Sequence, residues 1–217
     1  MWHRPIRIWH CEKRKALLYY GLKKMLLRPH IIYLHGFLSS PLSQKAQEMA
    51  GWMREQGLQD YFHCPQLPMD PNAAGALLQG LFFHLAHEDI CVVGSSLGGF
   101  FATWAAETFA CRAVLINPAV RPYERINEYL GPQRNYQTGE IHLIDACFAE
   151  QLQAFERQPS QPDKYWLLTQ TGDEVLDYQI GVSYYSACRQ TIIQGGDHAF
   201  ADFKPWLPEI WGFAQGR

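Results

Sequence analysis

Residues 94–98 read GSSLG, a stretch that could present a serine nucleophile. It fits the pattern G-x-S-x-G, in which the middle serine stands on a sharp turn between a strand and a helix. Small neighbours permit so tight a turn because they avoid Cβ clashes. The middle position is Ser96, so Ser95 is its small neighbour. The N–H of Leu97 would open the next helix, where partial positive charge favours a developing oxyanion.

A serine hydroxyl is a weak nucleophile and needs a base, which in turn needs an orienting carboxylate. His198, in the glycine-flanked stretch GGDHAF, is the candidate base. Asp173, in QTGDEV, is the candidate carboxylate because it lies closest to the end of a predicted strand, with Asp177 and Asp197 as rivals. The chain order Ser, Asp, His is that of the α/β-hydrolases. A second oxyanion donor is expected from the stretch LHGF, with the N–H of Phe37 as the candidate.

Apolar strand-like runs alternate with amphipathic stretches through the rest of the chain. This alternation predicts one α/β domain over residues 31–217, an α/β-hydrolase fold with a mainly parallel sheet flanked by helices. Ligands of open parallel sheets bind beyond the carboxyl ends of the strands. Ser96, Asp173 and His198 each follow such an end. The predicted strands cover 30–36, 61–67, 89–94, 112–118, 164–173 and 188–196, and the predicted helices 43–57, 71–87, 96–110, 178–187 and 200–214.

Residues 119–162 interrupt this rhythm with a connection much longer than those that usually join a strand to the next one. Long insertions of this kind are usually functional. The segment contains apolar residues at helical spacing between 141 and 155. We therefore predict a small helical cap over the site.

Composition narrows the classes of function. The chain has 217 residues and a net charge of −2, so charge gives no reason to expect a nucleic-acid partner. No apolar run reaches the ~20 residues of a membrane span. The six cysteines form no C-x-x-C pair and have no metal-ligand spacing with histidine, which predicts buried thiols in a cytoplasmic protein without metal or organic cofactor.

Residues 1–30 differ from the rest, with eight Lys or Arg and one acidic residue through Arg28. The apolar core and cleavage site of a secretory signal are missing. We expect a poorly packed extension. Two alternatives are an acid-poor targeting segment and a native start at Met25.

Several motifs together resemble the YqiA-type esterases, small bacterial α/β-hydrolases. They are YLHGFLSSP, VVGSSLGGFFATWAAE, LINPAVRPYE, YLGPQRNYQTGE, TGDEVLDY and GGDHAF, in order from about residue 31 to residue 213. The resemblance implies hydrolysis of carboxylic esters and activity on acyl-CoA thioesters. It carries over Ser96 as nucleophile, Asp173 as acid and His198 as base. It also brings Asn117, Pro118 and Arg121 near the site as candidate substrate-binding residues.

The expected function is therefore cleavage of a small-molecule ester with a short to medium acyl chain, through an acyl-enzyme on Ser96. One alternative is a thioesterase that acts on acyl-CoA or a carrier-bound acyl group with the same three residues. Another is a non-catalytic binding module on the same fold. A lipase acting at a lipid interface would need a large exposed apolar patch around the cap.

Overall fold

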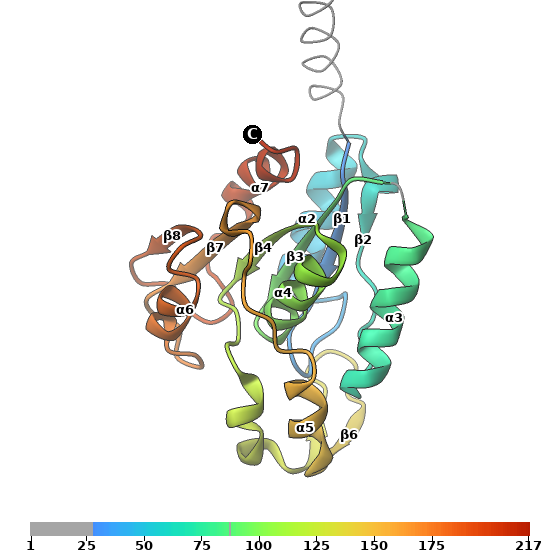
Figure 1. Ribbon diagram of the computed structural model, residues 1–217, viewed down its shortest axis with the longest axis vertical. Coiled ribbons are helices and arrows are strands. Elements are labelled where there is room, and N and C mark those ends of the chain that lie inside the picture. The colour runs from blue at the N-terminus through green and yellow to red at the C-terminus, as the bar shows by residue number, and fades with distance from the viewer. Residues whose placement is uncertain (1–27, 87) are drawn as a thin grey trace, which may run out of the picture.

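A six-stranded parallel sheet forms the centre of the protein, with strand order β2-β1-β3-β4-β7-β8. The computed structural model describes residues 28–86 and 88–217 (Figure 1). Every strand pairing in this sheet is parallel, which confirms the predicted fold class. The strands are β1 (His30–Leu34), β2 (Phe62–His63), β3 (Ile90–Ser95), β4 (Arg112–Ile116), β7 (Tyr165–Gln170) and β8 (Arg189–Ile193).

Helices cover both faces of the sheet, because alternate strand residues point to opposite sides. In β1, Ile32 and Leu34 belong to one core cluster, which α3, α4 and α6 cover. Ile31 and Tyr33 belong to the other, which α2 and α7 cover. The helices are α2 (Gln44–Glu55), α3 (Pro71–His84), α4 (Leu97–Phe109), α6 (Tyr178–Tyr184) and α7 (Leu207–Ala214).

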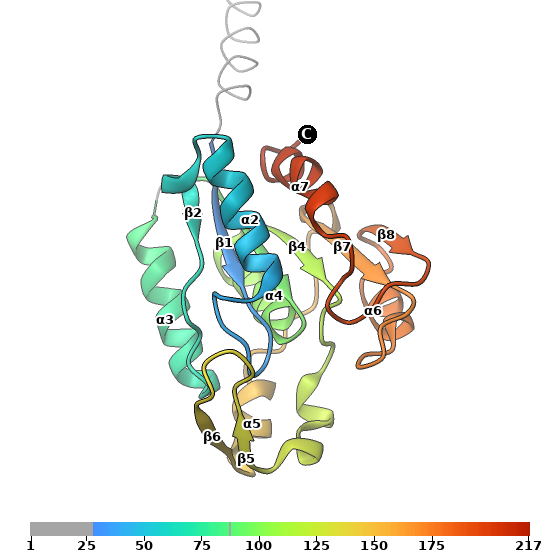
Figure 2. The ribbon, with the colours of Figure 1, turned by 180° about the vertical axis from the view of Figure 1, so that it is seen from behind.

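The part of the segment 119–162 from η2 to α5 lies at the end of the molecule opposite to α7, and the chain after α5 runs back toward β7 (Figures 1 and 2). Two short 3₁₀ turns, an antiparallel hairpin and one helix make up most of the segment. The helical expectation was wrong for residues 141–144, which form a strand. Its side chains alternate, with Ile144 buried and Leu143 exposed, and a period of two suits a strand. The elements are η2 (Pro122–Glu124), η3 (Ile126–Tyr129), β5 (Gly131–Arg134), β6 (Ile141–Ile144) and α5 (Cys147–Gln153).

Residues 1–27 of the predicted extension over residues 1–30 lie outside the described part of the chain. β1 begins at His30. Among the residues that the structure describes, no helix is both long and apolar enough to span a bilayer.

Candidate active site

Ser96 stands on a strained turn between β3 and α4. Its backbone has φ 55° and ψ −123°, a conformation that costs a non-glycine residue about 1–3 kcal/mol. The glycines around it are required by close approach. A Cβ on Gly94 would overlap the Gly98 carbonyl, and a Cβ on Gly98 would overlap the Leu34 carbonyl of β1. The turn is thus tight enough to project the Ser96 side chain beyond the carboxyl ends of the strands.

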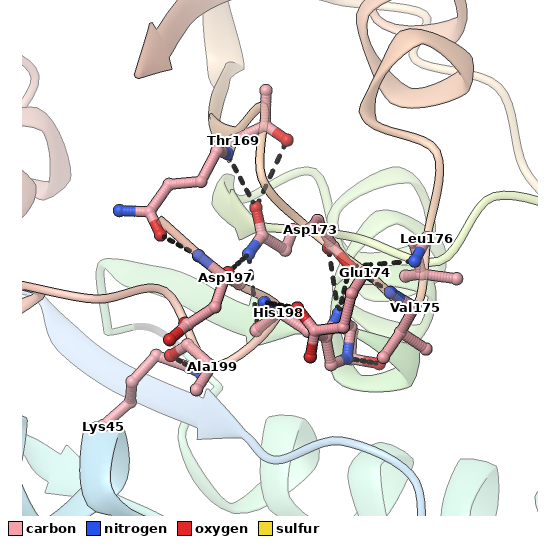
Figure 3. A network of polar contacts seen from close by, with 12 residues as sticks. Lys45, Thr169, Asp173, Glu174, Val175, Leu176, Asp197, His198 and Ala199 are labelled. Carbon is pink, nitrogen blue, oxygen red and sulfur yellow. Dashed lines mark hydrogen bonds and ion pairs between the residues drawn. The ribbon is translucent and has the colours of Figure 1, made fainter. Parts of the chain in front are cut away.

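His198 lies between Ser96 and Asp173. The Nε2 of its ring is 3.2 Å from Ser96 Oγ. Its Nδ1 is 2.9 Å from Asp173 Oδ2, and Figure 3 shows this side of the ring. A carboxylate can only accept, so the ring proton lies on Nδ1 and Nε2 is free to accept from the serine hydroxyl. The Asp173 side chain is 1% exposed and that of His198 is 23% exposed. The structure therefore brings the three predicted residues together in the arrangement of a nucleophile, a base and an orienting acid.

The Asp173 carboxylate is held by backbone as well as by His198. Its Oδ1 accepts from the N–H groups of Val175, at 2.9 Å, and Leu176, at 2.8 Å (Figure 3). Burial raises the pKa of Asp173, but the hydrogen bonds from His198, Leu176 and Val175 outweigh it, so the pKa lies below its usual value. The group is therefore ionised at neutral pH and stabilises a protonated His198.

The two rival carboxylates have other positions. The Asp177 side chain accepts from Gln179 N–H at 2.9 Å and caps α6. Asp197 Oδ1 is buried and has no hydrogen-bond partner within the described ranges 28–86 and 88–217. Of the three candidates, Asp173 is the one whose carboxylate contacts the His198 ring.

Asn117 holds the loop that carries His198. Its Nδ2 donates to the carbonyl of Asp197, at 2.9 Å, and to that of His198, at 3.2 Å. Its Oδ1 accepts from the Gln170 N–H at 3.0 Å and from the Thr169 hydroxyl at 3.2 Å. The side chain is buried, and these four contacts use its amide fully. The family resemblance makes Asn117 a candidate for substrate binding, whereas in the structure its side chain ties the His198 loop to the end of β7.

Two charged side chains also hold this loop, and sequence reasoning did not find either. The N–H of His198 donates to Glu174 Oε2 at 3.0 Å. The Lys45 ammonium, from the first turn of α2, donates to the Ala199 carbonyl at 2.6 Å (Figure 3). No sequence pattern would have found Lys45, because its partner lies more than 150 positions along the chain.

The loop after β1 lies against the nucleophile, as expected of an oxyanion site. A Cβ built on Gly36 would be 3.6 Å from Ser96 Oγ. The N–H groups of Phe37 and Leu97 donate to no protein acceptor in the described part of the chain. Both residues line the same cavity as Ser96 and His198. Two free donors next to the nucleophile can stabilise the oxygen of a tetrahedral intermediate.

His35 anchors this loop. Its Nε2 accepts from the Leu67 N–H at 3.0 Å, and its Nδ1 donates to the Gly36 carbonyl at 3.0 Å. Burial lowers the pKa of His35, although the Gly36 hydrogen bond opposes this. The ring is therefore neutral, and its two hydrogen bonds fix the loop after β1 against Leu67.

A cavity of about 220 Å³ opens on Ser96 and His198. Most of its walls come from the segment 119–162, including Val120, Ile126, Tyr129, Phe148 and Leu152. These side chains are largely apolar. The segment thus covers the nucleophile with an apolar chamber.

Pro118 and Arg121 do not line this cavity. Pro118 packs against α4, so closely that a Cβ added to Gly99 would lie 2.7 Å from the Cβ of Pro118. Arg121 is 45% exposed and pairs with Glu156 at 3.4 Å. Arg125 lines the cavity instead, and its guanidinium donates to the Val175 carbonyl at 2.9 Å. It connects the segment 119–162 to the loop of Asp173.

Solved structures of other proteins share this fold. Alpha/beta hydrolase domain-containing protein 10 from mouse matches with a TM-score of 0.63 and 18% identity, over 85% of this chain and 88% of that one. Est1E from Butyrivibrio proteoclasticus matches with a TM-score of 0.62 and 17% identity, over 87% and 86% of the two chains. An esterase domain from a Rhodothermus marinus protein matches with a TM-score of 0.59 and 14% identity, over 88% of both chains. At these identities the likeness shows the α/β-hydrolase fold.

A family model extends the comparison from fold to sequence. It is described as an uncharacterised protein family, UPF0227, and it matches residues 30–215. This range contains the three predicted site residues and the segment 119–162. The chain therefore belongs to UPF0227, the family of the YqiA-type hydrolases.

Proposed function

We propose that the protein is a serine hydrolase that cleaves carboxylic esters through an acyl-enzyme on Ser96. The observation that carries the proposal is the continuous contact from the buried Asp173 carboxylate through the His198 ring to Ser96 Oγ. The strained turn at Ser96 and the free donors beside it support the same chemistry. Membership of this family and the fold shared with esterases agree with it.

Acylation starts when His198 Nε2 takes the proton of Ser96 as Oγ forms a bond to the ester carbonyl carbon. The carbonyl oxygen becomes an oxyanion, which accepts hydrogen bonds from the N–H groups of Phe37 and Leu97. As the intermediate collapses, the bond to the leaving oxygen breaks and His198 gives its proton to that oxygen. The alcohol departs and the acyl group stays on Ser96.

Deacylation repeats these steps with water. His198 takes a proton from water while the water oxygen forms a bond to the acyl carbon. His198 then gives a proton to Ser96 Oγ as the bond between Oγ and the acyl carbon breaks and the carboxylic acid leaves. The apolar chamber of about 220 Å³ suits a short to medium acyl chain.

The test is covalent labelling by a fluorophosphonate, together with Ser96→Ala. We expect the probe to label the intact protein at Ser96 and the variant not at all. Esterase turnover in the variant should fall by at least about a thousandfold. Replacing the adjacent Ser95 by Ala should cost far less and serves as the matched control. A protein that the probe does not label would be a binding module, and full turnover without Ser96 would place the nucleophile elsewhere.

A further inference from the structure

The turn between β5 and β6 contacts the loop that carries the proposed oxyanion donor Phe37 (Figure 2). This turn, residues 135–140, has the sequence NYQTGE, a motif that the acyl-transfer steps do not use. The Asn135 amide donates through Nδ2 to the carbonyl of Ser39 at 2.9 Å. The Tyr136 N–H donates to the carbonyl of Leu38 at 3.0 Å. The segment 119–162 thus holds the two residues that directly follow Phe37.

The amide of Asn135 serves two different segments. Its Oδ1 accepts from the N–H groups of Gln137, at 2.9 Å, and Thr138, at 3.0 Å, and so closes its own turn. Its Nδ2 reaches out of the turn to the Ser39 carbonyl. Asn135 is only 3% exposed, so water competes little for these bonds. The amide of Gln66 also donates to the Ser39 carbonyl, but from an exposed position and at 3.4 Å.

The loop after β1 needs such restraints because its backbone is strained. Leu38 has φ 52°, a left-handed conformation that residues other than glycine adopt only where their surroundings hold it. Before Phe37, the His35 ring fixes the carbonyl of Gly36. After Phe37, the turn at residues 135–140 fixes the carbonyls of Leu38 and Ser39. The peptide N–H of Phe37 is therefore held from both sides.

The same segment also packs against the side chain of Phe37. The centroid of its ring lies 5.4 Å from that of Tyr129 and 6.2 Å from that of Phe148, both edge to face. Such apolar contacts keep the ring in place but direct the backbone only loosely, whereas hydrogen bonds are directional. An oxyanion donor must lie about 2.7–3.1 Å from the developing charge. The hydrogen bonds from Asn135 and Tyr136 can supply this precision.

Resting on the proposed esterase function, we propose that Asn135 is a positioning residue for the oxyanion site, which holds the N–H of Phe37 where the oxyanion of the tetrahedral intermediate forms. Asn135 does not line the apolar chamber, so it acts through the backbone of the loop after β1. Without its donor, Leu38 relaxes toward a more common φ and the Phe37 N–H turns away from the oxyanion. The segment 119–162 then contributes to catalysis as well as to the wall of the chamber.

The first test separates the two tasks of the amide by Asn135→Asp and Asn135→Ser. Both side chains keep an acceptor for the turn, and both lose the amide donor to Ser39. We expect kcat for p-nitrophenyl butyrate to fall about tenfold to a hundredfold, somewhat less than when an oxyanion donor is removed outright. KM should change less than about twofold, because the lost interaction is made in the transition state.

Thr138→Ala is the matched control for this test. Thr138 is exposed in the same turn, and its hydroxyl accepts from the Glu140 N–H at 3.3 Å without contacting the loop after β1. Its kcat should stay unchanged. Asn135→Ser is uncharged, so it provides the answer if the buried carboxylate of Asn135→Asp prevents folding. An unchanged kcat in the folded Asn135 variants would overturn the proposal.

The second test replaces the carbonyl oxygen of the substrate by sulfur, which is a weaker hydrogen-bond acceptor. The measured quantity is the ratio of kcat/KM for p-nitrophenyl butyrate to that for its thionoester, in which C=S replaces C=O. We expect this ratio to fall about fivefold in the Asn135 variants, as for one weakened hydrogen bond, and to stay constant in Thr138→Ala. A merely structural role would reduce both rates alike. A lower kcat with an unchanged ratio would therefore also overturn the proposal.

Failure of this inference is distinguishable from failure of the proposed function. Labelling of the intact protein at Ser96, and loss of turnover in Ser96→Ala, test the esterase mechanism without reference to Asn135. A labelled Ser96 together with full turnover in the Asn135 variants would leave that mechanism standing and remove only the role of Asn135. An intact protein that is neither labelled nor active on esters would remove both.

Discussion

The side chain of Asn117 holds His198 by its backbone, with Nδ2 3.2 Å from the His198 carbonyl oxygen, while the His198 ring faces Ser96. The two residues lie more than 80 positions apart in sequence. This contact connects the end of β4 to the loop after β8, across the intervening strand β7. The position of the proposed base therefore depends on a buried amide that does not line the apolar chamber.

Asn117→Ala should lower kcat about tenfold to a hundredfold with a smaller change in KM, because a loosened His198 loop misplaces the base. The lost hydrogen bonds should also lower the free energy of unfolding by about 1–3 kcal/mol. Asn117 has φ 40°, so Asn117→Gly is the matched variant that keeps the backbone conformation but removes the amide. Steady-state kinetics and urea unfolding measure the two effects. An unchanged kcat in both folded variants would contradict the positioning role.

Asp173→Asn should lower kcat by about 10⁴, because an amide can hold the wrong tautomer of His198. Asp177→Asn is the matched control. Its side chain caps α6, and asparagine caps a helix about as well as aspartate. Activity and stability should therefore change little in the control. Comparable losses in the two variants would reject the assignment of Asp173 as the orienting acid.

The free energy of unfolding should depend on Asp173 at acidic pH. The pKa of Asp173 is lower in the folded protein than in the unfolded chain, so folding favours the ionised form. Its contribution is fully present above the unfolded pKa of about 4 and is lost as pH falls through the folded pKa. The difference in unfolding free energy between the intact protein and Asp173→Asn should therefore shrink from pH 6 to pH 2. A difference that stays constant with pH would show that ionisation of Asp173 does not contribute to the free energy of unfolding.

Filling the apolar chamber should shorten the preferred acyl chain. Val120 lines this cavity and is only partly buried, so Val120→Phe adds volume with little disturbance of the core. We expect the ratio of kcat/KM for hexanoate to that for acetate to fall about tenfold in a series of p-nitrophenyl esters, since each methylene is worth roughly 1 kcal/mol. Val120→Thr keeps the side-chain shape and is the control. An unchanged ratio in Val120→Phe would show that the acyl chain lies elsewhere.

The sequence by itself determined the fold class and the residues that meet at the centre of the site. Ser96 was recognisable because its turn is a local structure, with glycines that only close backbone contacts explain. Asp173 and His198 were recognisable because parallel strands end at one edge of a sheet, so that side chains after different strands converge there. Both signals depend on short stretches of chain.

Only the tertiary structure decided what surrounds these residues. The Asn117 amide, the Lys45 ammonium and the Arg125 guanidinium act on partners 50 or more positions away, and no local pattern encodes such pairs. The hairpin within residues 119–162 also escaped prediction, because short apolar runs suit a strand or a helix until packing selects one. The apolar chamber beside Ser96 exists because segments distant in sequence close around that residue, and this arrangement is a property of the folded chain alone.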